Sequence, residues 1–223
     1  MTASIDIGGG PSGFPSGWNP GGMTSAAPQE RKAWMRETNG RRRITLSSLR
    51  DGMPGLTPAW GGVMAEAASV CLESQGHSVR VELSTDGALE ETVILKRLSV
   101  TPQMLLSHHD EEEATEHGAC GVAILTVRVL LNLIVVRRSR KGTGFDYWLN
   151  SDEDSLFQQG ERLEVSGIRK GPEATIKARI SEKIRQIQRF RGGSPVLIAV
   201  VEFSRPLLRL VKVSRPSLRI MKP

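Results

Sequence analysis

The chain has 223 residues, of which 39% are hydrophobic and 24% charged, and it carries a formal net charge of +6 with a pI near 9.7. This length suits one domain with an appendage or two small domains, and the composition is typical of a soluble globular protein. The positive charge favours polyanionic partners such as nucleic acid, because cationic side chains neutralise phosphates.

Simple patterns exclude several classes of protein. Cys71 and Cys120 stand far apart in apolar settings, so neither a zinc cluster nor a disulfide framework is predicted, and we expect reduced thiols in a cytoplasmic protein. No basic segment followed by an apolar core opens the chain, so no secretory signal is predicted. The most apolar run, residues 120–136, contains Arg128 and Asn132 and changes from helical to β character, which indicates a core helix and strand without membrane contact.

The first 40 residues are predicted to form a flexible arm. Residues 1–28 contain seven glycines and four prolines, a composition that cannot bury enough apolar surface to offset its ordering entropy. A basic cluster follows between residues 29 and 55, and it is consistent with either a solvated surface or phosphate contact. Its members are Arg31, Lys32, Arg36, Arg41, Arg42, Arg43 and Arg50.

Residues 41–105 are predicted to form a helix–hairpin extension of the sheet in the second half. Thr57 is a suitable helix cap and Pro58 suits the first turn, so a helix is expected from there to about Ser74, before Gly76. Residues 79–83 alternate as a half-buried strand, Asp86-Gly87 indicates a turn, and residues 92–98 form the return strand.

Residues 106–223 are predicted to hold the main α/β core, a mixed central sheet with flanking helices. The expected elements are a helix over 111–131, β runs over 133–136, 145–148 and 162–166, a helix over 173–191 and a strand over 196–203. The order is therefore αβββαβ. A basic C-terminal tail follows, and its prolines indicate an extended edge segment whose cations lie along a polyanion. These cations are Arg205, Arg209, Lys212, Arg215, Arg219 and Lys222.

Carboxylates on neighbouring elements form the candidate site. Glu164 and Ser166 share one face of their strand, because strand residues two apart point the same way. Asp146, on the preceding β run, can lie across from Glu164, and Glu116 is placed on the helix before that run to offer a third carboxylate. Clustered carboxylates hold Mg²⁺ or Mn²⁺, which polarises a phosphate and activates water. Alternatively, each carboxylate only pairs with nearby arginines.

This element order, with Asp146 and Glu164 on adjacent β runs, resembles the core of the PD-(D/E)xK (restriction-endonuclease-like) nuclease superfamily over about residues 111–203. Gly144-Phe-Asp146 resembles the Gly-x-Asp form of the motif. The resemblance implies that Asp146, Glu164 and Glu116 are catalytic residues and metal ligands. Ser166 occupies the usual lysine position, so a lysine from a neighbouring element is expected instead. Lys170 is the candidate, and Lys177 and Lys183 are within reach.

A basic turn leads directly into Asp146. Its four cations and the backbone donors at Gly142 and Gly144 are expected to bind phosphates on either side of a scissile bond, or else to form an exposed cationic hairpin. With only 4% aromatic residues, backbone recognition of duplex nucleic acid is predicted over stacking on single strands. The four cations are Arg137, Arg138, Arg140 and Lys141.

Three functions follow as hypotheses. The first, implied by the resemblance, is a Mg²⁺-dependent endonuclease that hydrolyses DNA, as the effector subunit of a bacterial defence or DNA-processing system. The second is a catalytically degenerate nuclease fold that binds nucleic acid or serves as an assembly subunit, for which Ser166 is the motivating feature. The third is a scaffold that docks on a protein partner or on copies of itself.

Overall fold

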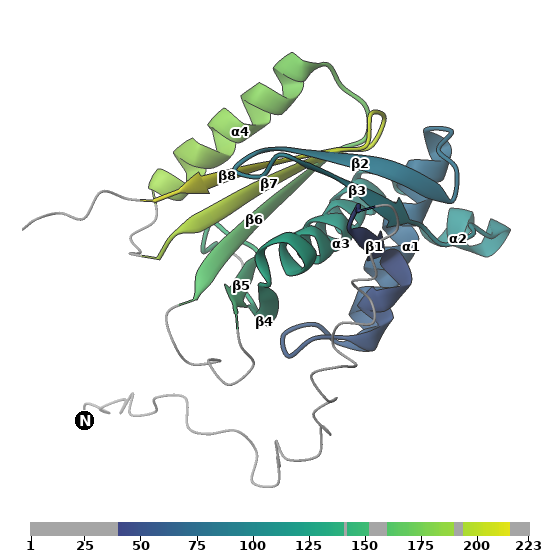
Figure 1. Cartoon of the computed structure of the whole chain (residues 1–223), viewed down its shortest axis with the longest axis horizontal. Coiled ribbons are helices and arrows are strands. Elements are labelled where there is room, and N and C mark those ends of the chain that lie inside the picture. Colours follow the sequence, from purple (N-terminus) through teal and green to yellow (C-terminus); the bar gives the residue numbers. More distant parts are fainter. Residues whose placement is uncertain (1–39, 141, 152–159, 190–193, 215–223) are drawn as a thin grey trace, which may run out of the picture. The chain divides into compact units, whose positions relative to one another are not determined.

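The computed structural model describes residues 40–140, 142–151, 160–189 and 194–214. They belong to one compact unit, residues 34–223, and form an eight-stranded mixed sheet flanked by helices (Figure 1). The predicted α/β class with a mixed central sheet is therefore confirmed. Most of the predicted N-terminal arm, residues 1–39, and Lys141 of the basic turn lie outside the described residues.

The first half of the described chain contains the predicted helix and hairpin. Thr57 caps α1 by accepting a hydrogen bond from the backbone N–H of Trp60 at 3.3 Å, and Pro58 occupies the first turn. Strand β1, the 3₁₀ helix and α2 were not predicted. The elements are β1 (Arg43–Thr45), a 3₁₀ helix (Leu46–Asp51), α1 (Pro58–Ser74), β2 (Arg80–Gly87), β3 (Glu91–Lys96) and α2 (Pro102–Ser107).

The second half follows the predicted order of elements. The bounds of α3 are those expected from its acidic start and apolar periodicity, and Asn132 ends this helix in the left-handed conformation with φ 55°. The elements are α3 (Glu111–Leu131), β4 (Ile134–Arg138), β5 (Tyr147–Asn150), β6 (Glu161–Ile168), α4 (Glu173–Gln188), β7 (Val196–Glu202) and β8 (Leu207–Val213).

The strand order is β1-β3-β2-β8-β7-β6-β5-β4. β8 lies between β2, with which it pairs in parallel, and β7, with which it pairs antiparallel. The prediction that the C-terminal cations belong to an edge segment is therefore wrong for β8. Leu208 and Leu210 of β8 are buried in the core. The basic side chains in and next to this strand form ion pairs with acidic residues. These pairs are Arg209 with Asp86 and Glu173, Arg205 with Glu202, and Lys212 with Glu161.

The helices form layers on both faces of the sheet (Figure 1). One core cluster joins α1 and α3 to the sheet, and a second joins α4 to the opposite face. β7 is buried along its whole length, because alternate side chains enter the two clusters. Leu197 and Ala199 pack on the α3 side, while Ile198 and Val200 pack on the α4 side.

α3 is the core helix of the molecule. By length and apolar composition it is the one helix among the described residues that could cross a membrane. In the fold, 67% of its most apolar window is buried. Packing against α1 and the sheet accounts for this composition.

The close approach of α1 and α3 depends on a glycine. A Cβ added to Gly118 in α3 would lie 2.9 Å from the backbone N and Cα of Ala68 in α1, a distance that real Cβ atoms essentially never show. Any larger residue at this position must push the two helices apart. The contact brings α1 next to the face of α3 that faces the sheet.

Gly118→Ala is expected to lower the free energy of unfolding by about 1–3 kcal/mol, because the backbone of α1 must shift. Gly62→Ala is the matched control: its Cβ would meet only the Arg50 side chain at 3.9 Å. Alanine favours helix over glycine, so this control should keep or raise stability by about 0.5–1 kcal/mol. Urea denaturation measures both, and equal stability of the two variants would contradict the packing argument.

Candidate active site

The β5–β6 ladder places Asp146 beside Glu164. Tyr147 pairs with Leu163 in an antiparallel register. Asp146, which directly precedes β5, therefore lies opposite Glu164 in β6. The backbone N–H of Asp146 donates to the Leu163 carbonyl at 2.8 Å, and its Oδ2 accepts from the Val165 N–H at 2.8 Å. Asp146 is therefore held by backbone hydrogen bonds to the residues on both sides of Glu164. The structure brings together the two carboxylates that were predicted from the sequence to lie side by side.

Burial and mutual repulsion make this pair hard to ionise. Glu164 is only 3% exposed, and its burial, reinforced by the negative charge of Asp146, raises the pKa of Glu164 to about 7. Burial also raises the pKa of Asp146. The hydrogen bond from the Val165 N–H and the positive charges of Lys183 and Arg138 act in the opposite direction, because they favour the ionised form. The Glu164 carboxyl therefore exchanges a proton with solvent near neutral pH.

Two cations from α4 lie over the same face of β6. Lys183 Nζ donates to Glu164 Oε1 at 2.5 Å, and Arg179 Nη1 donates to Ser166 Oγ at 2.8 Å. Four helical residues advance about 6 Å and two strand residues about 6.6 Å, so one turn of α4 matches the spacing of Glu164 and Ser166. The serine at the expected lysine position thus holds an arginine, while the lysine comes from the helix above.

Lys170 is not brought to the carboxylates. It is exposed in the turn after β6, six residues beyond Glu164, which is roughly 20 Å along an extended strand. Lys177 is exposed on α4. Lys183 was one of the three lysines named from the sequence, but Lys170 was preferred, because the contact of Lys183 depends on how α4 crosses β6. The four-residue spacing of Arg179 and Lys183, which matches that of Glu164 and Ser166, is the signal that could have favoured it.

Glu116 is exposed on α3 and does not join the pair. Cys120, one turn later on α3, lies nearer: burial, reinforced by the charge of Asp146, raises the pKa of this thiol to about 12, and it interacts with Tyr147. Within the part of the chain that the structure describes, no three His, Cys, Asp or Glu residues gather to hold a metal ion. The predicted three-carboxylate cluster is therefore reduced to Asp146 and Glu164.

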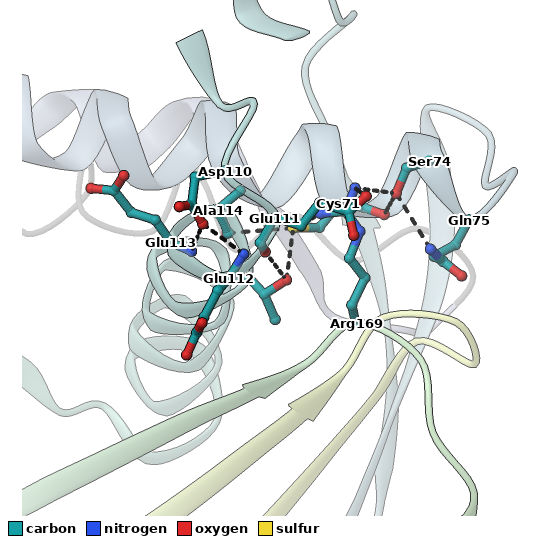
Figure 2. Close-up of polar contacts among 10 residues, drawn as sticks. Cys71, Ser74, Gln75, Asp110, Glu111, Glu112, Glu113, Ala114 and Arg169 are labelled. Atoms are coloured by element: carbon teal, nitrogen blue, oxygen red, sulfur yellow. Dashed lines mark hydrogen bonds and ion pairs between the residues drawn. The ribbon is translucent and has the colours of Figure 1, made fainter. Parts of the chain in front are cut away.

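The acidic start of α3 has a structural role (Figure 2). Asp110 Oδ1 caps the helix by accepting the backbone N–H groups of Glu112 and Glu113, each at 2.9 Å. Arg169, directly after β6, reaches Glu111 at 3.7 Å and Ser74 in α1 at 2.9 Å, as Figure 2 also shows. These contacts fasten the end of β6 to both helices beneath the sheet.

The basic turn lies beside the pair. Ser139 N–H donates to the Asp146 carbonyl at 2.7 Å, and Gly142 and Gly144 adopt positive φ values of 89° and 80° in the turn between. Three exposed cations mark this turn, and none forms an ion pair with another described residue: Arg137, Arg138 and Arg140. The turn is therefore an electropositive surface next to buried carboxylates.

Comparison of the chain with protein families, with curated proteins and with solved structures finds no match.

The raised pKa of Glu164 predicts a pH-dependent stability. Between its ordinary value of 4.5 and about 7, the folded chain binds more protons than the unfolded chain, so this group lowers the free energy of unfolding as pH rises. Glu164→Gln cannot ionise, so its loss of stability between pH 5 and pH 8 should be smaller than that of the wild type by on the order of 2 kcal/mol.

Urea denaturation at pH 5 and pH 8 measures this difference. Glu90→Gln, which changes an exposed carboxylate between β2 and β3, serves as the control and should keep the pH dependence of the wild type. The same pH dependence in Glu164→Gln and in the wild type would show that the buried carboxyl does not carry the effect.

Proposed function

We propose that the chain is a metal-dependent nuclease that hydrolyses phosphodiester bonds, with Asp146, Glu164 and Lys183 at its site. The observation that carries the proposal is the contact of the buried Glu164 with Lys183, beside the half-buried Asp146 and next to a turn of exposed arginines. A structural ion pair joins opposite charges only, whereas here a second carboxyl adjoins the Lys183–Glu164 pair and disfavours ionisation of Glu164. Clusters of this kind occur preferentially at functional sites.

The arrangement of the elements supports a restriction-endonuclease-like core. α3, β4, β5, β6, α4 and β7 follow one another along the chain, and β4 to β7 are neighbours in the sheet. β6 and β7 are parallel, β4, β5 and β6 are antiparallel in succession, and α3 and α4 cover opposite faces. The two carboxylates lie on adjacent strands, as in the resemblance over residues 111–203.

The donor set fits Mg²⁺ or Mn²⁺. Magnesium is a hard cation that keeps several waters and binds one or two carboxylates, so Asp146 and Glu164 suffice without Glu116. A divalent cation would also offset the burial that raises the pKa of both carboxyls and the charge of Asp146 that raises the pKa of Glu164 further. When bound, it supplies polarisation of the phosphate and acidifies a water molecule.

The chain's own residues divide the remaining work. Lys183, held against Glu164, is placed to orient a water or to stabilise charge that develops on the phosphate. Arg138, whose charge already acts on Asp146, and the exposed Arg137 and Arg140 would bind flanking phosphates. The proposal further includes DNA as the substrate, a defence or DNA-processing role, a cytoplasmic location, and association with a protein partner or with further copies of the chain. The net charge of +6 supports a nucleic-acid substrate.

The decisive experiment compares two lysines. Asp146→Asn and Glu164→Gln should abolish Mg²⁺-dependent cleavage of plasmid DNA, and Lys183→Met should lower the rate by about 10²-fold or more. Lys170→Met, which changes the exposed lysine first selected from sequence, should cleave like the wild type. Thermal melts establish that each variant is folded. Full activity in folded Asp146→Asn would refute the proposal.

The second candidate is a degenerate nuclease fold that binds nucleic acid or assembles without hydrolysis. Two observations favour it: the lysine position holds Ser166, which is engaged by Arg179, and the described residues gather only two carboxylates. In this case Mg²⁺ and Mn²⁺ should leave the melting temperature unchanged. A metal ion that binds the folded state alone raises it by mass action, and Asp146→Asn should cancel such a rise.

A further inference from the structure

Aromatic side chains gather at the carboxylate pair. The described residues include five Phe, Trp and Tyr residues, and four of them border this site, whereas the fifth, Phe203, is buried at the end of β7. Phe145 and Tyr147 flank Asp146, and Trp148 follows on β5. Trp60 comes from α1, and its ring lies beside Arg138, which pairs with Tyr147 across the β4–β5 ladder. Because aromatic residues make up only 4% of the chain, this is a strong local enrichment.

One part of this cluster remains accessible. Phe145 and Trp148 are half-buried and meet edge to face, with ring centroids 4.9 Å apart. The exposed Arg137, which pairs with Trp148 across the β4–β5 ladder, places its guanidinium 5.3 Å from the Trp148 ring centroid. On the other side of the aromatic pair, the Arg162 guanidinium lies 5.4 Å from the Phe145 ring centroid. Single-stranded nucleic acids stack their bases on partly exposed aromatic rings that lie beside cations.

The adjacent arginine makes a second contact of the same kind. Arg138 follows Arg137 and therefore points to the other face of β4. Its guanidinium lies 5.1 Å from the ring centroid of Trp60, which His117 meets edge-on at 4.9 Å. Arg137 and Arg138 are thus each held over an indole ring, and the turn presents cationic and aromatic groups together.

We propose that the surface formed by Phe145, Trp148 and Arg137 stacks an unpaired base of the substrate, so that the ligand is a single-stranded nucleic acid. The inference rests on the proposed function for its choice of ligand, and it replaces the duplex expected from composition. In a duplex the bases are stacked on one another, so only the phosphates reach such a surface. A single strand offers both a phosphate to the arginines and a base to the rings.

Binding without hydrolysis tests this. A fluorescein-labelled oligo(dT) and a hairpin duplex with the same number of phosphates are titrated with the full chain in EDTA, and binding is followed by fluorescence anisotropy. The wild type should bind the single strand more tightly. Trp148→Leu should weaken single-strand binding by about tenfold and leave duplex binding unchanged, since stacking on one aromatic residue contributes about that factor. Trp148→Phe, which keeps a ring, should retain most of the affinity.

Arg140→Gln is the matched control for backbone contact. It should weaken both ligands alike and reduce the salt dependence of binding, because it removes a phosphate contact and no ring. Thermal melts establish that the variants are folded. Equal binding of the two ligands by the wild type, unchanged single-strand affinity in Trp148→Leu, or no binding at low salt would each overturn the inference.

The outcomes separate this inference from the nuclease proposal. Loss of single-strand binding in Trp148→Leu supports the stacking surface even when the wild type cleaves nothing, because the assay requires no metal. Metal-dependent cleavage of duplex DNA that is insensitive to Trp148→Leu overturns the stacking surface and leaves the nuclease proposal standing.

Discussion

The carboxyl groups of Asp146 and Glu164 lie side by side, although the charge of Asp146 disfavours ionisation of Glu164. The surrounding strands and helix hold both groups in place. The β5–β6 pairing sets the two residues side by side, and the backbone N–H of Val165 holds the Asp146 carboxylate. α4 brings Lys183 to one of them, which offsets part of the unfavourable charge. Burial between the layers strengthens both effects, because charges interact more strongly away from water. Strand pairing, helix position and core packing therefore converge on this one contact.

The distribution of positive charge also has a clear logic. Arg41, which precedes β1, pairs with Glu82 in β2, and Arg209 in β8 pairs with Asp86. Their charge is largely neutralised and serves to join elements of the sheet. Arg140 and its neighbours in the basic turn lack acidic partners among the described residues, and they lie beside the buried carboxylates. The basic turn therefore keeps three exposed arginines, without ion pairs to the rest of the described chain, close together in the fold.

Sequence reasoning succeeded where the determinants are local. The cap at Thr57, the periodicity of α3 and the two-residue spacing of β6 each depend on neighbouring residues, and each gave the correct element or pairing. It failed where distant elements meet. The contact of Lys183 depends on the crossing of α4 over β6, and Trp60 meets Arg138 although 78 residues separate them. In β8, apolar and basic residues alternate, and this sequence pattern suits an edge strand. It also suits an interior strand when the basic side chains find acidic partners, so the sequence alone does not decide between the two positions.

The position of β8 also has a consequence for biosynthesis. It joins the β1-β3-β2 part of the sheet to the β7-β6-β5-β4 part, and its contact with β2 spans 123 residues, from Asp86 to Arg209. A chain emerging from the ribosome therefore completes the other seven strands of the described sheet before β8 can bridge them. Until then β2 and β7 both present unpaired backbone groups to other chains. Newly made molecules thus pass through a stage that is prone to aggregation, and insertion of one strand ends it.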